Sequence, residues 1–221
     1  MVGHTFEFNP AVIKIKEFIE KGELGKIYYI TLRRLNLGII RDDINALWNL
    51  APHDISILNF ITGNSPVKVK TWGASFLKEG HEDLVFINLL YPGNIIANVH
   101  VSWLDPLKVR EGVIVGSKKM VFYDDVNSEA RLKIYDKGAD RLVNKKSEHG
   151  YGEFQIKLRA GDLLVPKIDM KEPLKQECRH FIDCIVKGKR PRTDGKNGLR
   201  VVQVLNAAQE SLKNSGREIT I

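Results

Sequence analysis

One histidine of the sequence stands where it could exchange a proton with a ligand. His53 lies in the segment Trp48–Leu58, directly after Pro52. Proline is tolerated in the first turn of a helix, so we place His53 near the start of a helix that runs from about residue 50 to residue 61. The positive end of the helix dipole disfavours an imidazolium there, which favours a neutral imidazole that acts as a base.

A second polar residue shares the predicted helix face with His53. Asn49 precedes His53 by four positions, and residues four apart lie on the same side of a helix. The Asn49 amide can position a hydroxyl group of a ligand, although it cannot take up a proton. Residue chemistry alone leaves open the commoner alternative, in which His53 is a structural histidine on an apolar helix.

Two further side chains could contact a small ligand. Arg41 lies in the irregular, polar residues 37–47 and could clamp a phosphate or carboxylate, or it could be an ordinary exposed loop arginine. Trp103 ends an alternating apolar strand and could stack on a ligand, although packing against a sheet is the commoner role. His100 is on the polar side of that strand and faces either solvent or another subunit.

Motifs for several other chemistries are missing from the sequence. It has no Gly-x-Gly-x-x-Gly dinucleotide loop, no Gly-x-x-x-x-Gly-Lys-Ser/Thr phosphate loop and no Gly-x-Ser-x-Gly elbow. Without Cys-x-x-Cys or His-x-x-x-His pairs, we expect no metal site.

No apolar run is long enough to span a bilayer, and the N-terminus does not resemble a secretory signal. Cys178 and Cys184 lie six apart on one predicted helix, so we expect buried free thiols in a reducing cytoplasm.

The formal net charge of +7 allows an anionic partner. Basic residues are scattered among acidic ones, as in Lys14, Lys16, Glu17, Glu20 and Lys21, which favours a solvated surface over nucleic-acid binding. A phosphorylated or otherwise anionic substrate agrees better with this pattern than nucleic acid does. Steeply salt-dependent binding would be the signature of the nucleic-acid alternative.

The order of the predicted elements indicates an α+β fold. Strands that follow one another through short turns pair in antiparallel fashion, so we expect a large, mostly antiparallel open sheet with helices packed on one face. In the last two helices, apolar stripes comprise Leu174, Cys178, Phe181, Ile182 and Ile185, and Leu199, Val202, Leu205, Ala208 and Leu212. The predicted helices cover residues 10–21, 50–61, 173–187 and 197–214, and the predicted strands cover 26–36, 67–76, 84–91, 95–103, 109–115, 120–123, 131–135 and 217–221, with loops and short strands over 137–171.

Several motifs, taken in order, resemble the C-terminal domain of the glucose–fructose oxidoreductase / inositol dehydrogenase (Gfo/Idh/MocA) family. They are Val2 to Pro10 (VGHTFEFNP), Gly22 to Tyr28 (GELGKIY), Leu50 to Ile55 (LAPHDI), Ser102 to Pro106 (SWLDP) and the tail that contains PRTDG. The resemblance covers nearly the whole chain. It implies that residues 1–221 are a single substrate-binding and oligomerisation domain, and that the N-terminal dinucleotide-binding domain of the family is absent.

The resemblance also implies a function and its residues. Family members transfer hydride between a sugar carbon and NAD or NADP, and a histidine matching His53 handles the hydroxyl proton. Asn49 stands where a carboxylate is common, and the partner lysine would fall before Met1. We therefore expect the substrate half of a sugar or nucleotide-sugar oxidoreductase that binds no cofactor alone and is inactive without a Rossmann-domain polypeptide. The alternative is a non-catalytic sugar-binding or assembly module derived from it.

The resemblance places further residues at the substrate. His4, Thr5 and Phe6 match the family's first strand, whose end borders nicotinamide and substrate, although an exposed strand end is an equal alternative. With them, Arg41 and Trp103 complete the predicted substrate-binding set. Family sheets commonly pair across their open face, which implies a homo-oligomer, and neither nucleic acid nor membrane is an expected partner.

Overall fold

The structure is a computed structural model that describes residues 1–142 and 155–221. The helical elements are η1 (Thr5–Phe8), α1 (Pro10–Glu20), α2 (Ala46–Thr62), α3 (Pro173–Lys187) and α4 (Gly195–Lys213). The strands are β1 (Ile27–Leu35), β2 (Lys68–Ala74), β3 (Leu84–Tyr91), β4 (Ile95–Ser102), β5 (Val109–Gly116), β6 (Met120–Asp124), β7 (Leu132–Leu142), β8 (Gln155–Leu164) and β9 (Ile219–Thr220).

The described strands form one sheet in the order β8-β7-β6-β5-β1-β4-β3-β2-β9. Neighbours in the sheet are antiparallel except β1 and β4, which run parallel because β1 inserts between β4 and β5. The tight turn between β3 and β4 has positive φ angles at Gly93 and Asn94, residue types that tolerate this backbone conformation. The predicted α+β fold with a mostly antiparallel open sheet is confirmed.

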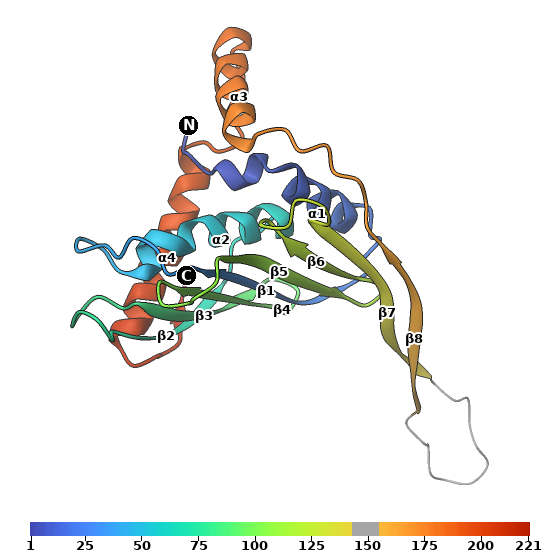
Figure 1. Cartoon of the computed structure of the whole chain (residues 1–221), viewed down its shortest axis with the longest axis horizontal. Helices are drawn as coiled ribbons and strands as arrows, with labels where there is room; N and C mark the ends of the chain where they lie inside the picture. The colour runs from blue at the N-terminus through green and yellow to red at the C-terminus, as the bar shows by residue number, and fades with distance from the viewer. Residues whose placement is uncertain (143–154) are drawn as a thin grey trace.

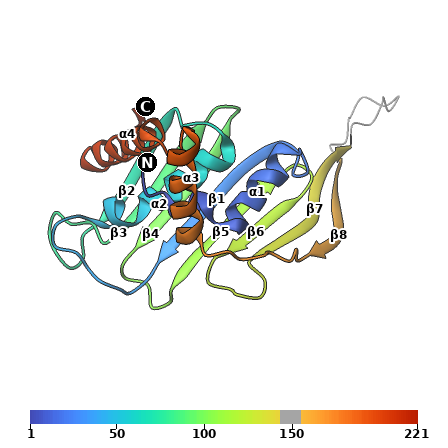
Figure 2. The same ribbon diagram turned by 90° about the horizontal axis from the view of Figure 1, so that it is seen from above.

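Three helices cover one face of the sheet, and α3 stands away from it (Figures 1 and 2). Alternation along the strands directs one set of apolar side chains toward α1, α2 and α4, such as those of Ile87 and Val99, both fully buried. Asn9 caps α1 by accepting a hydrogen bond from the Ala11 amide, as its place before Pro10 predicts. In the described part of the chain, no helix is both long and apolar enough to cross a membrane.

Two N-terminal elements differ from the sequence prediction. The segment containing His4, Thr5 and Phe6 was predicted as a strand, but Thr5–Phe8 forms the 3-10 helix η1. Helix α2 begins at Ala46, four residues before the predicted start, because the Asn45 side chain caps it by accepting from the Trp48 amide. Pro52 is consequently inside α2 rather than in its first turn.

The C-terminal half also corrects three expectations. Instead of loops and short strands over 137–171, β7 and β8 form a long hairpin, although its tip falls outside the described residues. In α4 the buried stripe contains Val201 and Val204, whereas Leu199 and Val202 are exposed because the helix is rotated relative to the predicted stripe. The cysteines are free, but Cys178 is exposed and only Cys184 is buried.

Candidate active site

A cleft of about 490 Å³ opens beside His53 at the ends of β1 and β5. Its walls come from η1, β1, the loop after β1, α2, the residue that follows β4 and the start of β5. A volume of this size can hold a small ligand. The lining residues are Phe6, Arg34, Leu35, Asn36, Gly38, Ile39, Arg41, Asn49, Leu50, His53, Trp103 and Arg110.

His53 is the eighth residue of α2, so the helix dipole at its first turn does not act on it as predicted. Burial instead lowers the His53 pKa to about 4, and the nearby positive charge of Arg34 contributes. The expected neutral imidazole therefore has a different physical cause. The ring of Phe6 packs against it at a centroid distance of 5.4 Å. His53 is uncharged near neutral pH and can accept a proton.

Asn49 lies one turn before His53 and is oriented by Trp103. The indole Nε1–H of Trp103 donates to Asn49 Oδ1 at 3.1 Å. Because an indole N–H can only donate, the Asn49 amide oxygen must face Trp103. The Asn49 Nδ2 amide hydrogens remain free to donate to a ligand. Trp103 itself is buried in the core and also lines the cleft, so it orients Asn49 rather than lying open for stacking.

A buried ion pair supports the cleft floor. Arg34 Nε and Nη2 donate to the two carboxylate oxygens of Asp54 at 2.7 and 3.1 Å, and both residues are buried. The Arg34 guanidinium also lies over the Phe6 ring, 4.5 Å from its centroid. This arrangement joins β1, α2 and η1 directly beside His53, so it holds the imidazole and the aromatic ring in fixed positions.

The other predicted substrate residues occupy different places. Arg41 lines the cleft and is paired through two hydrogen bonds, at 2.9 and 2.7 Å, with Asp43. Thr5 Oγ1 donates to Glu177 Oε2 at 2.6 Å and borders a neighbouring hollow rather than the cleft. His4 is buried outside the cleft lining, and burial lowers its pKa. Of the three N-terminal candidates His4, Thr5 and Phe6, only Phe6 lines the cleft.

The predicted substrate-binding set did not include Arg34, Asn36 or Arg110, although all three line the cleft. One signal for Arg34 was present. It continues the inward-facing alternation of Ile30 and Leu32 in β1, and a charged residue at such a position requires a buried partner. Arg110 lies opposite Arg34 across the β1–β5 pair, a neighbour that depends on the strand order.

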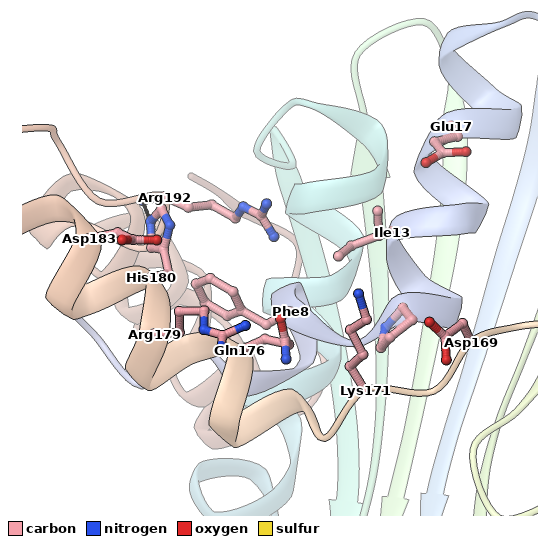
Figure 3. A pocket seen from close by; sticks show the side chains of 11 residues that line it. Phe8, Ile13, Glu17, Asp169, Lys171, Gln176, Arg179, His180, Asp183 and Arg192 are labelled. Carbon is pink, nitrogen blue, oxygen red and sulfur yellow. Dashed lines mark hydrogen bonds between the residues drawn. The ribbon is translucent and has the colours of Figure 1, made fainter. Parts of the chain in front are cut away.

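A separate groove of about 470 Å³ lies between α1 and α3 and does not include His53 (Figure 3). Gln176, Arg179 and Asp183 of α3 face Ile13 and Glu17 of α1 across it. Nearby, His180 Nε2 accepts from the Arg192 backbone N–H at 3.0 Å and is close to Cys184 Sγ at 3.4 Å. These polar contacts attach α3 to the body. In the described residues no cluster of histidine, cysteine and carboxylate side chains could hold a metal ion.

The chain is similar to several oxidoreductases along almost its whole length. The uncharacterized oxidoreductase YrbE of Bacillus subtilis (strain 168) is 23% identical over 96% of this chain and 60% of its own length. The aldose-aldose oxidoreductase from Caulobacter crescentus, solved with glycerol, is 17% identical with a TM-score of 0.76, covering 100% of this chain and 63% of that one. UDP-N-acetylglucosamine 3-dehydrogenase GnnA from Acidithiobacillus ferrooxidans is 21% identical with a TM-score of 0.72, covering 96% and 62%.

The chain thus spans about 60% of the length of the curated relative that it matches. Its sequence also matches the family model described as the GFO/IDH/MocA C-terminal domain, over residues 12–122, which is half of the chain. The match includes β1, α2 and the strands up to β6, and therefore contains His53 and most of the cleft. The chain belongs to the GFO/IDH/MocA oxidoreductase family, in which it corresponds to the C-terminal domain.

Proposed function

We propose that this chain is the substrate-binding half of a nicotinamide-dependent sugar or nucleotide-sugar oxidoreductase. The observation that carries the proposal is His53, a half-buried imidazole with a lowered pKa that lines a polar cleft one helical turn after an oriented amide. Such a residue can accept the proton of a substrate hydroxyl. Hydroxyl groups and hydrogen-bond acceptors of a sugar ring match the donors that Asn49 and the cleft arginines present.

The proposed division of labour assigns only the proton and the substrate to this chain. When the alcohol group of a substrate is oxidised to a carbonyl, its carbon loses a hydride and its hydroxyl proton passes to the His53 ring. A nicotinamide held elsewhere supplies the acceptor for the hydride. The described residues include no strand, glycine loop and helix that would cradle a dinucleotide, so this chain does not fit the cofactor by itself. We predict that the 221-residue chain alone oxidises no sugar.

The exposed face of α3 supports a partner domain. The side of α3 that meets the body carries Glu177, His180 and Cys184, whereas its apolar residues point outward. A helix that buries its polar side and exposes its apolar side needs another surface to cover it. The exposed residues are Leu174, Phe181, Ile182, Ile185 and Val186, with exposed fractions of 45–75%.

We infer that a dinucleotide-binding domain covers the part of this face formed by Phe181, Ile182, Ile185 and Val186, beyond Leu174 at the start of the helix. The matched family model is a C-terminal domain, so the unmatched part of the relatives precedes it. The first residues of this chain lie against the loop that joins α3 to α4, where Val2 N–H donates to Thr193 O at 2.7 Å. Leu174 at the start of α3 borders a hollow that shares Phe6 with the His53 cleft. A domain on α3 would therefore lie close to His53.

We also propose that a second copy of this chain covers the open face of the sheet. This face exposes Tyr29, Trp72, Phe86 and Ile96 in adjacent strands, and the His100 ring stacks on Phe86 at 4.3 Å. Interleaved charges such as Arg33 and Glu111, which pair at 2.8 Å, suit a self-complementary contact. Light scattering should give the mass of an oligomer, and Trp72→Lys should reduce it.

The catalytic proposal is tested by His53→Ala in the enzyme assembled with its dinucleotide-binding domain. Turnover of aldoses and nucleotide sugars, measured as the absorbance of reduced nicotinamide, should fall by about 10²–10⁴-fold. The circular dichroism spectrum and thermal midpoint should stay close to those of the wild type. Wild-type turnover in this variant would refute the role of His53, and turnover by the isolated chain would refute the division of labour.

A further inference from the structure

Arg110 lies where two hollows meet. It lines the His53 cleft, and it also lines a second hollow of about 340 Å³. Phe6 is the other residue that both hollows share. A ligand with one end at His53 can therefore extend past the Arg110 guanidinium into the second hollow without crossing the protein core.

Arg110 is also the arginine of this region with the weakest acidic partner. Arg34 and Arg41 each donate two hydrogen bonds to a carboxylate. The carboxylate recorded nearest Arg110 is Asp125, at 3.9 Å, too far for a hydrogen bond. Asp125 is in addition occupied by Asn9 Nδ2 at 2.9 Å and by Arg131 Nη1 at 3.4 Å. The half-exposed Arg110 guanidinium thus has donors available for an anion.

The lining of the second hollow combines apolar and polar groups. Phe6, Met170, Pro173 and Leu174 contribute apolar surface, and the polar groups beside Arg110 come from Thr5, Asn9, Asp125, Arg131 and Glu172. A flat or apolar group fits such a wall, and a bare sugar would leave it uncovered. A ligand that fits both hollows would then have hydroxyl groups at His53, an anionic group at Arg110 and a flat or apolar group in the second hollow.

We propose that Arg110 binds the diphosphate of a nucleoside diphosphate sugar, with the sugar at His53 and the base in the second hollow. This assignment rests on the proposed function for the sugar end only. Guanidinium groups bind phosphate oxygens through paired, charge-assisted hydrogen bonds. The positive charges of Arg34, Arg110 and His4 lower the His53 pKa, and the Asp54 carboxylate raises it. A diphosphate at Arg110 would offset one of these positive charges.

The test is calorimetric binding to the 221-residue chain, with UDP-N-acetylglucosamine, UDP, inorganic pyrophosphate and N-acetylglucosamine as separate probes. Arg110→Gln should weaken binding of the three phosphate-bearing probes by about tenfold or more and leave N-acetylglucosamine unaffected. The matched control is Arg200→Gln, which removes an exposed arginine of α4 that lines neither hollow. A control that weakens binding as much as Arg110→Gln overturns the proposal, as does UDP that binds no better than N-acetylglucosamine.

A second variant keeps the proposal testable if Arg110→Gln does not fold. Leu174 is 55% exposed, so Leu174→Asp should leave folding intact. This variant should weaken UDP binding severalfold while pyrophosphate binding changes little, because only the base contacts Leu174. Equal weakening of both probes would overturn the placement of the base. The two proposals can fail separately. If His53→Ala does not change turnover but the phosphate-bearing probes still bind at Arg110, the catalytic proposal is refuted and the Arg110 site stands.

Discussion

Helices α2 and α3 both carry apolar residues but place them in opposite environments. In α2 the residues Ile55, Ile57, Leu58 and Ile61 are buried against the sheet and neighbouring helices. In α3 the apolar residues are exposed, and Glu177 and Cys184 are the ones that are buried. An apolar stripe therefore shows that a helix needs a covering surface, but it does not show whether the same chain supplies that surface.

The largest effect is expected where α2 is tied to β1. Arg34→Met should lower the free energy of unfolding by roughly 3–5 kcal/mol, because it leaves the buried Asp54 carboxylate without its partner. Urea denaturation monitored by circular dichroism measures this change. Arg33→Met, one residue away and exposed, should change stability by no more than about 0.5 kcal/mol. Similar values for the two variants would show that the pair does not hold α2 in place.

The double variant Arg34→Met/Asp54→Leu refines this prediction. Removing both charges avoids an unpaired buried ion, so the double variant should be more stable than Arg34→Met alone. If it is less stable, the ion pair contributes specific geometry that apolar side chains cannot replace.

A somewhat smaller effect is expected from the titration of His53. Its folded pKa of about 4 lies below the ordinary value of 6.5, so between these values the unfolded chain binds a proton that the folded chain does not. The free energy of unfolding should therefore fall as the pH decreases from about 6.5 to 4, by up to about 3 kcal/mol.

Comparison with His53→Gln isolates this contribution, because burial also lowers the pKa of His4 and His100. The variant should lose less stability over the same pH range. An NMR titration that places the His53 pKa near 6.5 would contradict the desolvation that lowers this pKa and the neutral state expected of the imidazole.

The smallest effect on stability is expected at the exposed face of α3. Ile182→Glu/Val186→Glu should change the free energy of unfolding of this chain by no more than about 0.5 kcal/mol, since both side chains are already exposed. The same pair should weaken binding of a dinucleotide-binding domain by about tenfold or more, measured with the unmatched N-terminal part of Bacillus subtilis YrbE. Ile156→Glu/Leu158→Glu on β8 is the matched control and should bind normally. Normal binding by the α3 pair would place the partner elsewhere.

Local patterns were sufficient for much of the fold. The alternation of Ile95, Ala97, Val99 and Val101 predicted β4, and the predicted bounds of β3 agree with the structure. Alternation works here because one face of the sheet is buried and the other is not. Helix α2 was predicted too short because Pro52 was interpreted as a first-turn residue, whereas the cap is Asn45. The start of β7 was predicted as a strand over residues 131–135, but the rest of the β7–β8 hairpin was missed because its residues, many of them exposed, lack a clear alternation.

The sequence by itself determined the chemical types at the site. Asn49 and His53 share a helix face wherever α2 begins, since a four-residue spacing depends only on helix geometry. Tertiary structure alone decided the partners: Trp103 orients Asn49, Arg34 pairs with Asp54, and Arg110 lies between two hollows. The physical reason is that these contacts join residues far apart in the chain, and strand order and helix placement determine which of them meet. The same holds for α3, whose outward apolar face follows from how it attaches to η1.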